Sequence, residues 1–383
     1  MGWPLSDEES MMRDALTTLA AELAAAELMR SAPGSDHSPE SSSLSQRRWQ
    51  AHTAGHGAGE DLDRVEQQRW QARAELFTAR FAELELPGLW FGPEHGGSGA
   101  SPAVWALTLQ TLAAGSLTSA WLLFSHSLAA LAWQSSWPKG WSQGVPLLSG
   151  CQASTAGAMA MMLPTSPWIV TGGYAHTQVT AMPRTVANLK PAPLHHLWQG
   201  PWWQELEAVP PGKAGVQAAD LSPAAQHLLA WWDALGTAAL AVGLGQQAVR
   251  LAKTYALERK AFGKPISSFQ AIQAQWVDAN TQVSAAEAMV RACAVRSDLA
   301  ARTGAELALA IKPEHLGDAA AARIMATTAA REATRMATQV YGGNGVMCEY
   351  PVEWLWRAAK VLELQSGGLR RATQDLLQHR ELA

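Results

Sequence analysis

The part of the chain that follows Ser222 and Pro223 restricts the fold most strongly, because its sequence predicts one helix after another. Serine is a frequent N-cap and proline a frequent first helical residue, so this pair marks a helix start. The segments beyond it are rich in alanine and leucine with charged residues on one side, which is typical of an antiparallel helical bundle. The predicted helices cover about residues 223–260, 268–303, 313–340 and 351–365, followed by a terminal helix from about residue 369.

Helices are also predicted for the N-terminal part of the chain. Ser6 is suited to cap a helix that runs to about Met29, because apolar residues recur there at helical spacing. These apolar residues are Leu16, Leu19, Ala20 and Leu23. Residues 31–60 combine proline, glycine and a serine run, and we expect a mobile loop because such a segment buries too little apolar surface to order itself. Helices are predicted again at about 61–84 and 103–133, the second as one long apolar helix.

The middle of the chain, residues 144–221, has frequent glycine and proline and short β-type runs at 168–171 and 178–180. Such runs between turn residues indicate short strands. The predicted fold is therefore mainly α with a small central β region. It comprises an N-terminal helical domain (1–143), a reduced middle β domain (144–221) and a C-terminal four-helix bundle (222–383).

The composition excludes several classes of partner. The chain has 29 basic and 33 acidic residues and a net charge of −4, so no basic face for nucleic acid or for an anionic membrane is expected. Cys151, Cys293 and Cys348 lie far apart, which argues against a disulfide framework or a zinc site and fits a reducing cytoplasm. The N-terminus shows no signal-peptide pattern. No apolar run approaches the roughly 18 to 20 residues of a membrane span.

Two apparent motifs are set aside. His195 and His196 lie in a loop rich in proline and tryptophan without matching ligands, so a solvated or packing role is favoured over metal binding, and no metal is predicted. Gly243-Leu-Gly245 resembles the start of a dinucleotide fingerprint. It falls within a predicted helix that no strand precedes, so we reject that interpretation.

A Gly-Gly-Asn-Gly turn at residues 342–345 lies between two predicted helices, and Pro351 suits the first turn of the second helix. Glycines allow backbone angles that other residues avoid and bring amide groups close to a ligand. The alternative is a corner that only reverses the chain between the helices.

Three motifs resemble the acyl-CoA dehydrogenase family, in the correct order along the chain. They are LPGLWFGPEHGGSG (86–99), YALERKAFGKPISSFQAIQ (255–273) and TQVYGGNGVMCEYPVEWLWRAAK (338–360). The resemblance implies an N-terminal helical domain, a β domain and a helical bundle, assembled as a dimer of dimers. It also implies FAD at a subunit interface, which accepts a hydride from the β-carbon of an acyl-CoA while a glutamate takes the α-proton.

The resemblance assigns six residues to a shared FAD site. These residues are Arg259, Phe262, Gln270, Gln339, Gly342 and Gly343. Arg259 matches the arginine that reaches the FAD pyrophosphate of the neighbouring subunit, and the glycines match positions on the adenosine side. A cation and a closely approaching backbone are what a diphosphate requires. The alternative for Arg259 is an exposed cation at a helix end, beside Glu258.

The other half of the family's site departs from the pattern. Residues 149–162 lack the family's flavin-binding segments, and Ser366 occupies the usual position of the catalytic glutamate. Serine without a partner is not a base of suitable strength. Some members carry the glutamate on an earlier helix, and that position falls on Asp233. The favoured interpretation of Asp233 is a half-exposed helical carboxylate rather than a catalytic base.

Three functions stay open. The favoured hypothesis is a non-catalytic subunit that completes the FAD site of a catalytic acyl-CoA dehydrogenase partner, as an α2β2 hetero-oligomer acting on an acyl-CoA with an electron-transfer flavoprotein as acceptor. The second is a self-sufficient homo-oligomeric enzyme that uses Asp233 as base. The third is a flavin-free structural or regulatory pseudoenzyme. The sequence does not identify the acyl group.

Overall fold

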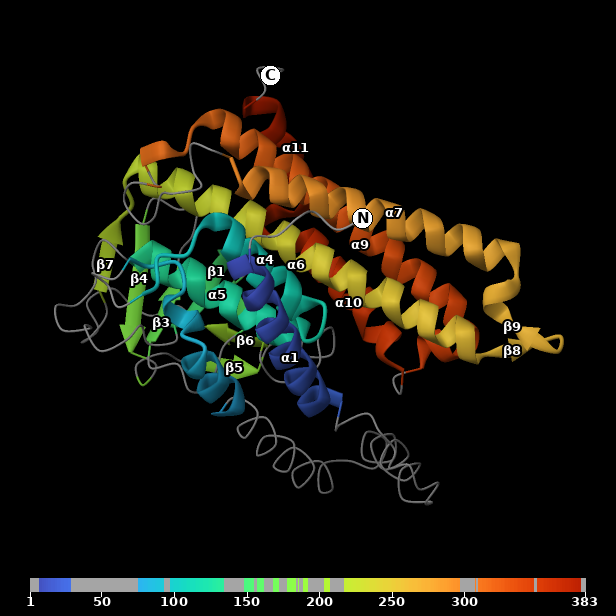
Figure 1. Ribbon diagram of the computed structural model, residues 1–383. Coiled ribbons are helices and arrows are strands. Elements are labelled where there is room, and N and C mark those ends of the chain that lie inside the picture. The colour runs from blue at the N-terminus through green and yellow to red at the C-terminus, as the bar shows by residue number, and fades with distance from the viewer. Residues whose placement is uncertain are drawn as a thin grey trace.

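In the computed structural model the described parts form two helical regions, one large sheet and a small two-stranded hairpin (Figure 1). The structure describes residues 7–28, 75–92, 97–133, 148–154, 157–161, 168–171, 178–183, 185, 189–191, 203–206, 217–296, 307, 309–347 and 350–379. The predicted loop at 31–60, the first part of the helix predicted at 61–84, Ser6, His195, His196 and the predicted domain boundary at 143/144 lie outside these residues.

The N-terminal helix is confirmed as α1 (Asp7–Leu28), and its four apolar repeat positions are buried. The long helix predicted at 103–133 is instead two helices, α4 (Pro102–Ala113) and α5 (Leu117–Trp133). The break has a local cause at Gly115 and Ser116. A Cβ on Gly115 would lie 2.6 Å from the Cβ of Ala20, and the Ser116 Oγ accepts a hydrogen bond from the Ser119 amide at 3.2 Å, which starts a new helix.

His126 on α5 has no exposed surface, and its Nε2 donates a hydrogen bond to the carbonyl oxygen of Pro87 at 2.8 Å. Burial lowers the pKa of His126 from 6.5 to about 4, because desolvation disfavours the charged imidazolium, while the hydrogen bond to Pro87 opposes that shift. Between these two values the unfolded chain binds a proton that the folded protein does not bind. The stability that neutral His126 contributes is therefore present above pH 6.5 and is lost as the pH falls to about 4.

We expect the wild type to lose about 2 to 3 kcal/mol of unfolding free energy through this histidine between about pH 7 and about pH 4.5. His126→Gln keeps a donor for Pro87 but does not titrate, so its stability should fall less over the same interval. Urea unfolding of both proteins at the two pH values measures the difference. Parallel losses in the two proteins would contradict the assignment.

Seven strands form one sheet in the order β5-β6-β2-β1-β3-β4-β7. The strands are β1 (Leu148–Ser154), β2 (Gly157–Met161), β3 (Trp168–Thr171), β4 (Gln178–Pro183), β5 (Leu189–Pro191), β6 (Trp203–Leu206) and β7 (Gln217–Asp220). Strands β1 and β3 pair in parallel and all the other pairs are antiparallel. The two predicted strands are confirmed as β3 and β4. The other five were missed, because strands this short give little alternating pattern.

Helix α6 (Pro223–Glu258) is the centre of the molecule, and the Ser222 Oγ caps it by accepting from the Ala225 amide at 3.2 Å. It packs against α4 and α5 on one side and against the C-terminal helices on the other (Figure 1). Gly243 and Gly245 are interior residues of this helix, where a Cβ would lie 2.3 Å from the Gln110 carbonyl oxygen and 2.8 Å from Val283 respectively. Close helix packing therefore explains these glycines, and the rejection of a dinucleotide fingerprint is confirmed.

The expectation that no apolar run reaches the length of a membrane span was wrong for α6. A window of 18 residues within Pro223–Glu258 has a mean hydropathy of 1.4, which by length and composition would suffice to cross a bilayer. However, 94% of that window is buried inside the protein, as expected for a core helix.

Four more helices of the C-terminal bundle have bounds within the described residues. These are α7 (Gln270–Ala294), α9 (Pro313–Tyr341), α10 (Pro351–Leu364) and α11 (Gly368–His379). They confirm the predicted helices, except that α7 ends at Ala294 rather than near residue 303. A short hairpin of β8 (Lys260–Ala261) and β9 (Lys264–Pro265) follows α6 and was not predicted. In Figure 1 this hairpin lies at the end of the bundle where α9 ends.

Candidate functional site

A pocket of about 430 Å³ opens at this end of the bundle, where the end of α6 meets the turn after α9. The turn is a short 3-10 helix, η6 (Gly342–Val346). The pocket is lined by Tyr255, Arg259, Ile266, Val340, Tyr341, Gly342, Gly343 and Asn344. Three of the six residues that the sequence assigned to FAD therefore meet in one concave site, namely Arg259, Gly342 and Gly343.

The two pocket glycines leave their backbone uncovered. A Cβ built on Gly342 or on Gly343 meets no atom within 4 Å, whereas one on Gly345 in the same turn would lie 2.3 Å from the carbonyl oxygen of Thr338. Gly342 has a φ of 59°, in the region that favours glycine. Gly345 is thus required by packing, while Gly342 and Gly343 present open backbone to the pocket. Open backbone beside an arginine fits a diphosphate-bearing group.

Arg259 is the C-cap of α6, and its backbone is fixed on both sides. Its amide donates to the Tyr255 carbonyl oxygen at 2.8 Å, and its carbonyl oxygen accepts from the Ile266 amide at 2.8 Å. The Arg259 side chain is exposed. The structure is therefore compatible with both interpretations of this residue, phosphate binding and a solvated charge at the helix end.

The other three predicted FAD residues, Phe262, Gln270 and Gln339, are exposed and do not line the pocket. Phe262 is 96% exposed and has a φ of 52°, an unfavourable combination for a bulky apolar residue. Its ring meets the Phe269 ring edge-on with centroids 6.3 Å apart and is otherwise open to solvent in the described part of the chain.

Tyrosines and an asparagine that the sequence analysis did not single out form the wall of the pocket. The rings of Tyr255 and Tyr341 stack with centroids 4.0 Å apart, and the Asn344 Nδ2 donates to the Tyr255 hydroxyl at 3.1 Å. Burial raises the pKa of Tyr341 to about 12, with smaller contributions from Tyr255, Glu258 and Tyr350, so this phenol stays protonated. These residues could have been found from the sequence, because they lie within the motifs at 255–273 and 338–360.

The two candidate positions for the catalytic base touch each other, and of the two Asp233 is buried while Ser366 is half-buried. The Ser366 Oγ donates to the Asp233 Oδ1 at 2.9 Å, and the Arg323 Nη1 donates to the Asp233 Oδ2 at 3.3 Å. Arg323 Nη2 also donates to the carbonyl oxygen of Gln365, immediately before Ser366. Asp233 is 1% exposed and Arg323 is 3% exposed, so the interpretation of Asp233 as a half-exposed carboxylate was wrong.

Arg323 explains why a carboxylate can be buried here, because a guanidinium compensates its charge. The sequence held a signal for this arginine. It stands seven residues after Leu316 and seven before Ala330, both buried, and so occupies the core face of α9. Ser366 has a φ of 51°, which a serine adopts only under constraint, and its hydrogen bond to Asp233 supplies one.

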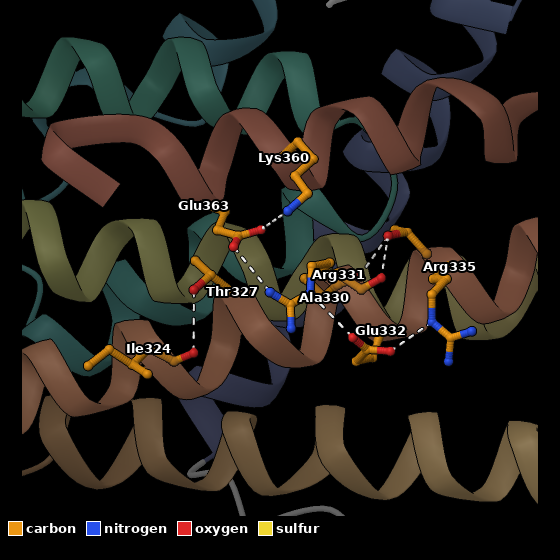
Figure 2. Close-up of polar contacts among 9 residues, drawn as sticks. Ile324, Thr327, Ala330, Arg331, Glu332, Arg335, Lys360 and Glu363 are labelled. Carbon is orange, nitrogen blue, oxygen red and sulfur yellow. Dashed lines mark hydrogen bonds and ion pairs between the residues drawn. The ribbon is translucent and has the colours of Figure 1, made fainter. Parts of the chain in front are cut away.

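A second polar group fixes the end of α10, just ahead of Ser366 (Figure 2). The Glu363 carboxylate accepts hydrogen bonds from the Arg331 Nη1 at 3.1 Å and from the Lys360 Nζ at 2.7 Å.

On the outer side of α9, Arg335 Nε donates a hydrogen bond to Glu332 at 2.8 Å, and this bond is the largest cause of the lowered pKa of Glu332. No group of three or more potential metal-ligating side chains occurs among the described residues.

Comparison with known proteins identifies the bundle. Residues 230–369 match the family model "Acyl-CoA dehydrogenase, C-terminal domain". Over 133 residues the chain is 39% identical to the probable acyl-CoA dehydrogenase YngJ of Bacillus subtilis and 35% identical to an acryloyl-CoA reductase (NADH) of Anaerotignum propionicum. These alignments cover 35% of this chain and 32% and 31% of the relatives, so the chain matches about a third of the length of each.

Solved structures resemble the chain over its whole length. Butyryl-CoA dehydrogenase of Megasphaera elsdenii covers 100% of both chains with a TM-score of 0.65 and 18% identity. A chain of the Tcur3481–Tcur3483 steroid ACAD covers 98% of both with a TM-score of 0.67 and 15% identity.

The protein thus has the fold of the acyl-CoA dehydrogenases, with the helical, β and helical parts that the three sequence motifs implied. Residues 230–369 of its C-terminal bundle resemble the acyl-CoA dehydrogenase C-terminal domain.

Proposed function

We propose that this chain is a subunit of an FAD-dependent acyl-CoA dehydrogenase that lacks its own catalytic base and completes the FAD site of a catalytic partner subunit. The observation that carries the proposal is the contrast between two sites along α6. In the first half of the helix Asp233 is bonded to both Ser366 and Arg323. At the C-terminal end of the helix, Arg259 and two unhindered glycines face an open pocket.

The two sites are far apart within one chain. Asp233 and Arg259 are separated by 26 residues of a continuous helix, which corresponds to about 39 Å. One flavin therefore cannot have its reactive ring beside Asp233 of this chain while its diphosphate is held by the pocket residues and Arg259 in a compact site. The pocket serves best as part of a site that a second subunit completes, and the exposed Phe262 fits the same contact.

FAD, when bound, would accept the hydride that leaves the acyl-CoA. In this chain Arg259 would neutralise phosphate charge, while the backbone of Gly342 and Gly343 would approach the nucleotide closely. Proton abstraction from the substrate would fall to a carboxylate of the partner, and an electron-transfer flavoprotein would reoxidise the flavin in a cytoplasmic setting.

A self-sufficient enzyme that uses Asp233 is the alternative. The geometry argues against it, because both carboxylate oxygens already accept hydrogen bonds and the group has almost no exposed surface. A base must come within hydrogen-bond reach of the proton that it removes. A flavin-free pseudoenzyme is also less well supported, because it assigns no purpose to a pocket with open glycines beside an arginine.

The experiment is co-purification of the chain with acyl-CoA dehydrogenase subunits from its own genome, followed by flavin absorbance. We expect flavin in the complex and none in the chain alone. Arg259→Ala should weaken flavin binding about tenfold or more, because it removes a charge-assisted hydrogen bond. Arg370→Ala is the matched control, since Arg370 is an exposed arginine of α11 that does not line the pocket.

The alternatives give different results. Flavin in the isolated chain, with dehydrogenase activity abolished by Asp233→Asn, would support the self-sufficient enzyme and overturn the proposal. Absence of flavin from both the chain and the complex would overturn both enzyme hypotheses.

A further inference from the structure

Three of the four tyrosines of the chain gather beneath the pocket. Tyr255 comes from α6, Tyr341 is the last residue of α9, and Tyr350 precedes α10. The Tyr255 and Tyr341 rings stack at 4.0 Å with an interplanar angle of 17°, and Tyr341 meets Tyr350 edge-on with centroids 5.8 Å apart. Aromatic pairs in these geometries stabilise beyond the area that they bury.

These contacts hold the Gly342–Val346 turn on both sides and in its middle. Tyr341 stands immediately before the turn and Tyr350 shortly after it. Asn344, within the turn, donates its Nδ2 to the hydroxyl of Tyr255 at 3.1 Å. Tyr255 is therefore the residue of α6 on which the tyrosine stack and the hydrogen bond from the turn converge.

Packing fixes one part of the turn and leaves another open: Gly345 lies against the Thr338 carbonyl oxygen, whereas nothing covers Gly342 and Gly343. Gly342 and Gly343 have no side chain and no neighbours at the Cβ position, and a glycine-rich segment has more conformations to lose than any other. The internal hydrogen bond from the Met347 amide to the Asn344 carbonyl oxygen is 3.3 Å long. The hydrogen bond from Asn344 to Tyr255 adds a fixed point directly beside this open backbone.

We infer that Tyr255 is a positioning residue for the nucleotide pocket, whose hydroxyl holds Asn344 and so fixes the two open glycines toward the ligand. The inference rests on the proposed function, because the ligand is taken to be FAD shared with a partner. It adds to that proposal a residue that acts through the turn rather than through charge.

Tyr255→Phe tests the inference, because it keeps the stack with Tyr341 and removes only the acceptor of Asn344. We expect the complex to bind FAD about fivefold more weakly, the usual effect of one hydrogen bond, with little change in its melting temperature. Tyr350→Phe is the matched control, because it removes the hydroxyl of the third tyrosine of the group, which packs edge-on against Tyr341 and does not line the pocket.

Asn344→Ala should weaken FAD binding as Tyr255→Phe does. The double variant should bind FAD no more weakly than either single variant, because each substitution removes the same hydrogen bond. Hydrogen exchange gives a readout without flavin. The amides of Met347 and Tyr350, which close the turn, should exchange about fivefold faster in Tyr255→Phe than in Tyr350→Phe.

The outcomes separate this inference from the proposed function. If the wild-type complex binds FAD but Tyr255→Phe binds it equally well, the positioning role is overturned and the proposed function stands. If the wild-type complex holds no FAD, the proposed function is overturned and exchange alone decides: faster exchange in Tyr255→Phe supports a fixed turn, and unchanged exchange overturns it.

Discussion

Arg323→Met should destabilise the protein by about 3 to 5 kcal/mol. The variant keeps most of the apolar stem of the side chain but leaves the Asp233 carboxylate, which is 1% exposed, without its guanidinium. It also removes the donor to the Gln365 carbonyl oxygen next to Ser366. A buried charge that loses its partner cannot recover its hydration, so the cost exceeds that of an ordinary lost hydrogen bond.

Equilibrium unfolding in urea measures this loss. Arg335→Met is the control, because Arg335 lies on the same helix and is paired with Glu332 but has 65% of its side chain exposed. That substitution should cost at most about 1 kcal/mol. The double variant Arg323→Met with Asp233→Leu should regain most of the stability, since it removes both charges. Equal losses in the two single arginine variants would contradict the buried ion pair.

Much of the helical architecture follows from the sequence, because long segments with apolar periodicity leave few alternatives. The starts of α6, α9 and α10 were predictable from a proline at the first helical positions. The split between α4 and α5 was not predictable from periodicity, because both helices are apolar on nearly all sides. It depends on how closely Gly115 approaches Ala20, a contact between residues distant in sequence.

The candidate site was predictable only in part, for a similar reason. Arg259, Gly342 and Gly343 lie in local motifs, and the structure brings them to one pocket. The contact between Asp233 and Ser366 joins residues 133 positions apart, and only the packing of α6 against the end of α10 creates it. Sequence alone therefore left Asp233 as a choice between a base and a surface carboxylate, when it is a buried partner of Arg323.

The turn after α9 offers a matched pair of substitutions that separates folding from ligand binding. Gly345→Ala should destabilise the protein by about 2 to 4 kcal/mol, because its Cβ would lie 2.3 Å from the Thr338 carbonyl oxygen. Backbone atoms cannot rotate away from such a clash as a flexible side chain can. Gly343→Ala should change stability by no more than about 0.5 kcal/mol, since its Cβ would meet nothing within 4 Å.

Gly343→Ala, which should leave the stability of the chain unchanged, should nevertheless weaken flavin binding. The methyl group of Gly343→Ala occupies the space in which we place the nucleotide, so the complex with the partner should bind FAD roughly tenfold more weakly while the chain stays as stable as the wild type. Urea unfolding of the chain and flavin titration of the complex supply the two measurements. A Gly343→Ala complex with wild-type flavin affinity would show that the open backbone is not where the cofactor lies, and would leave the turn as a corner that only reverses the chain.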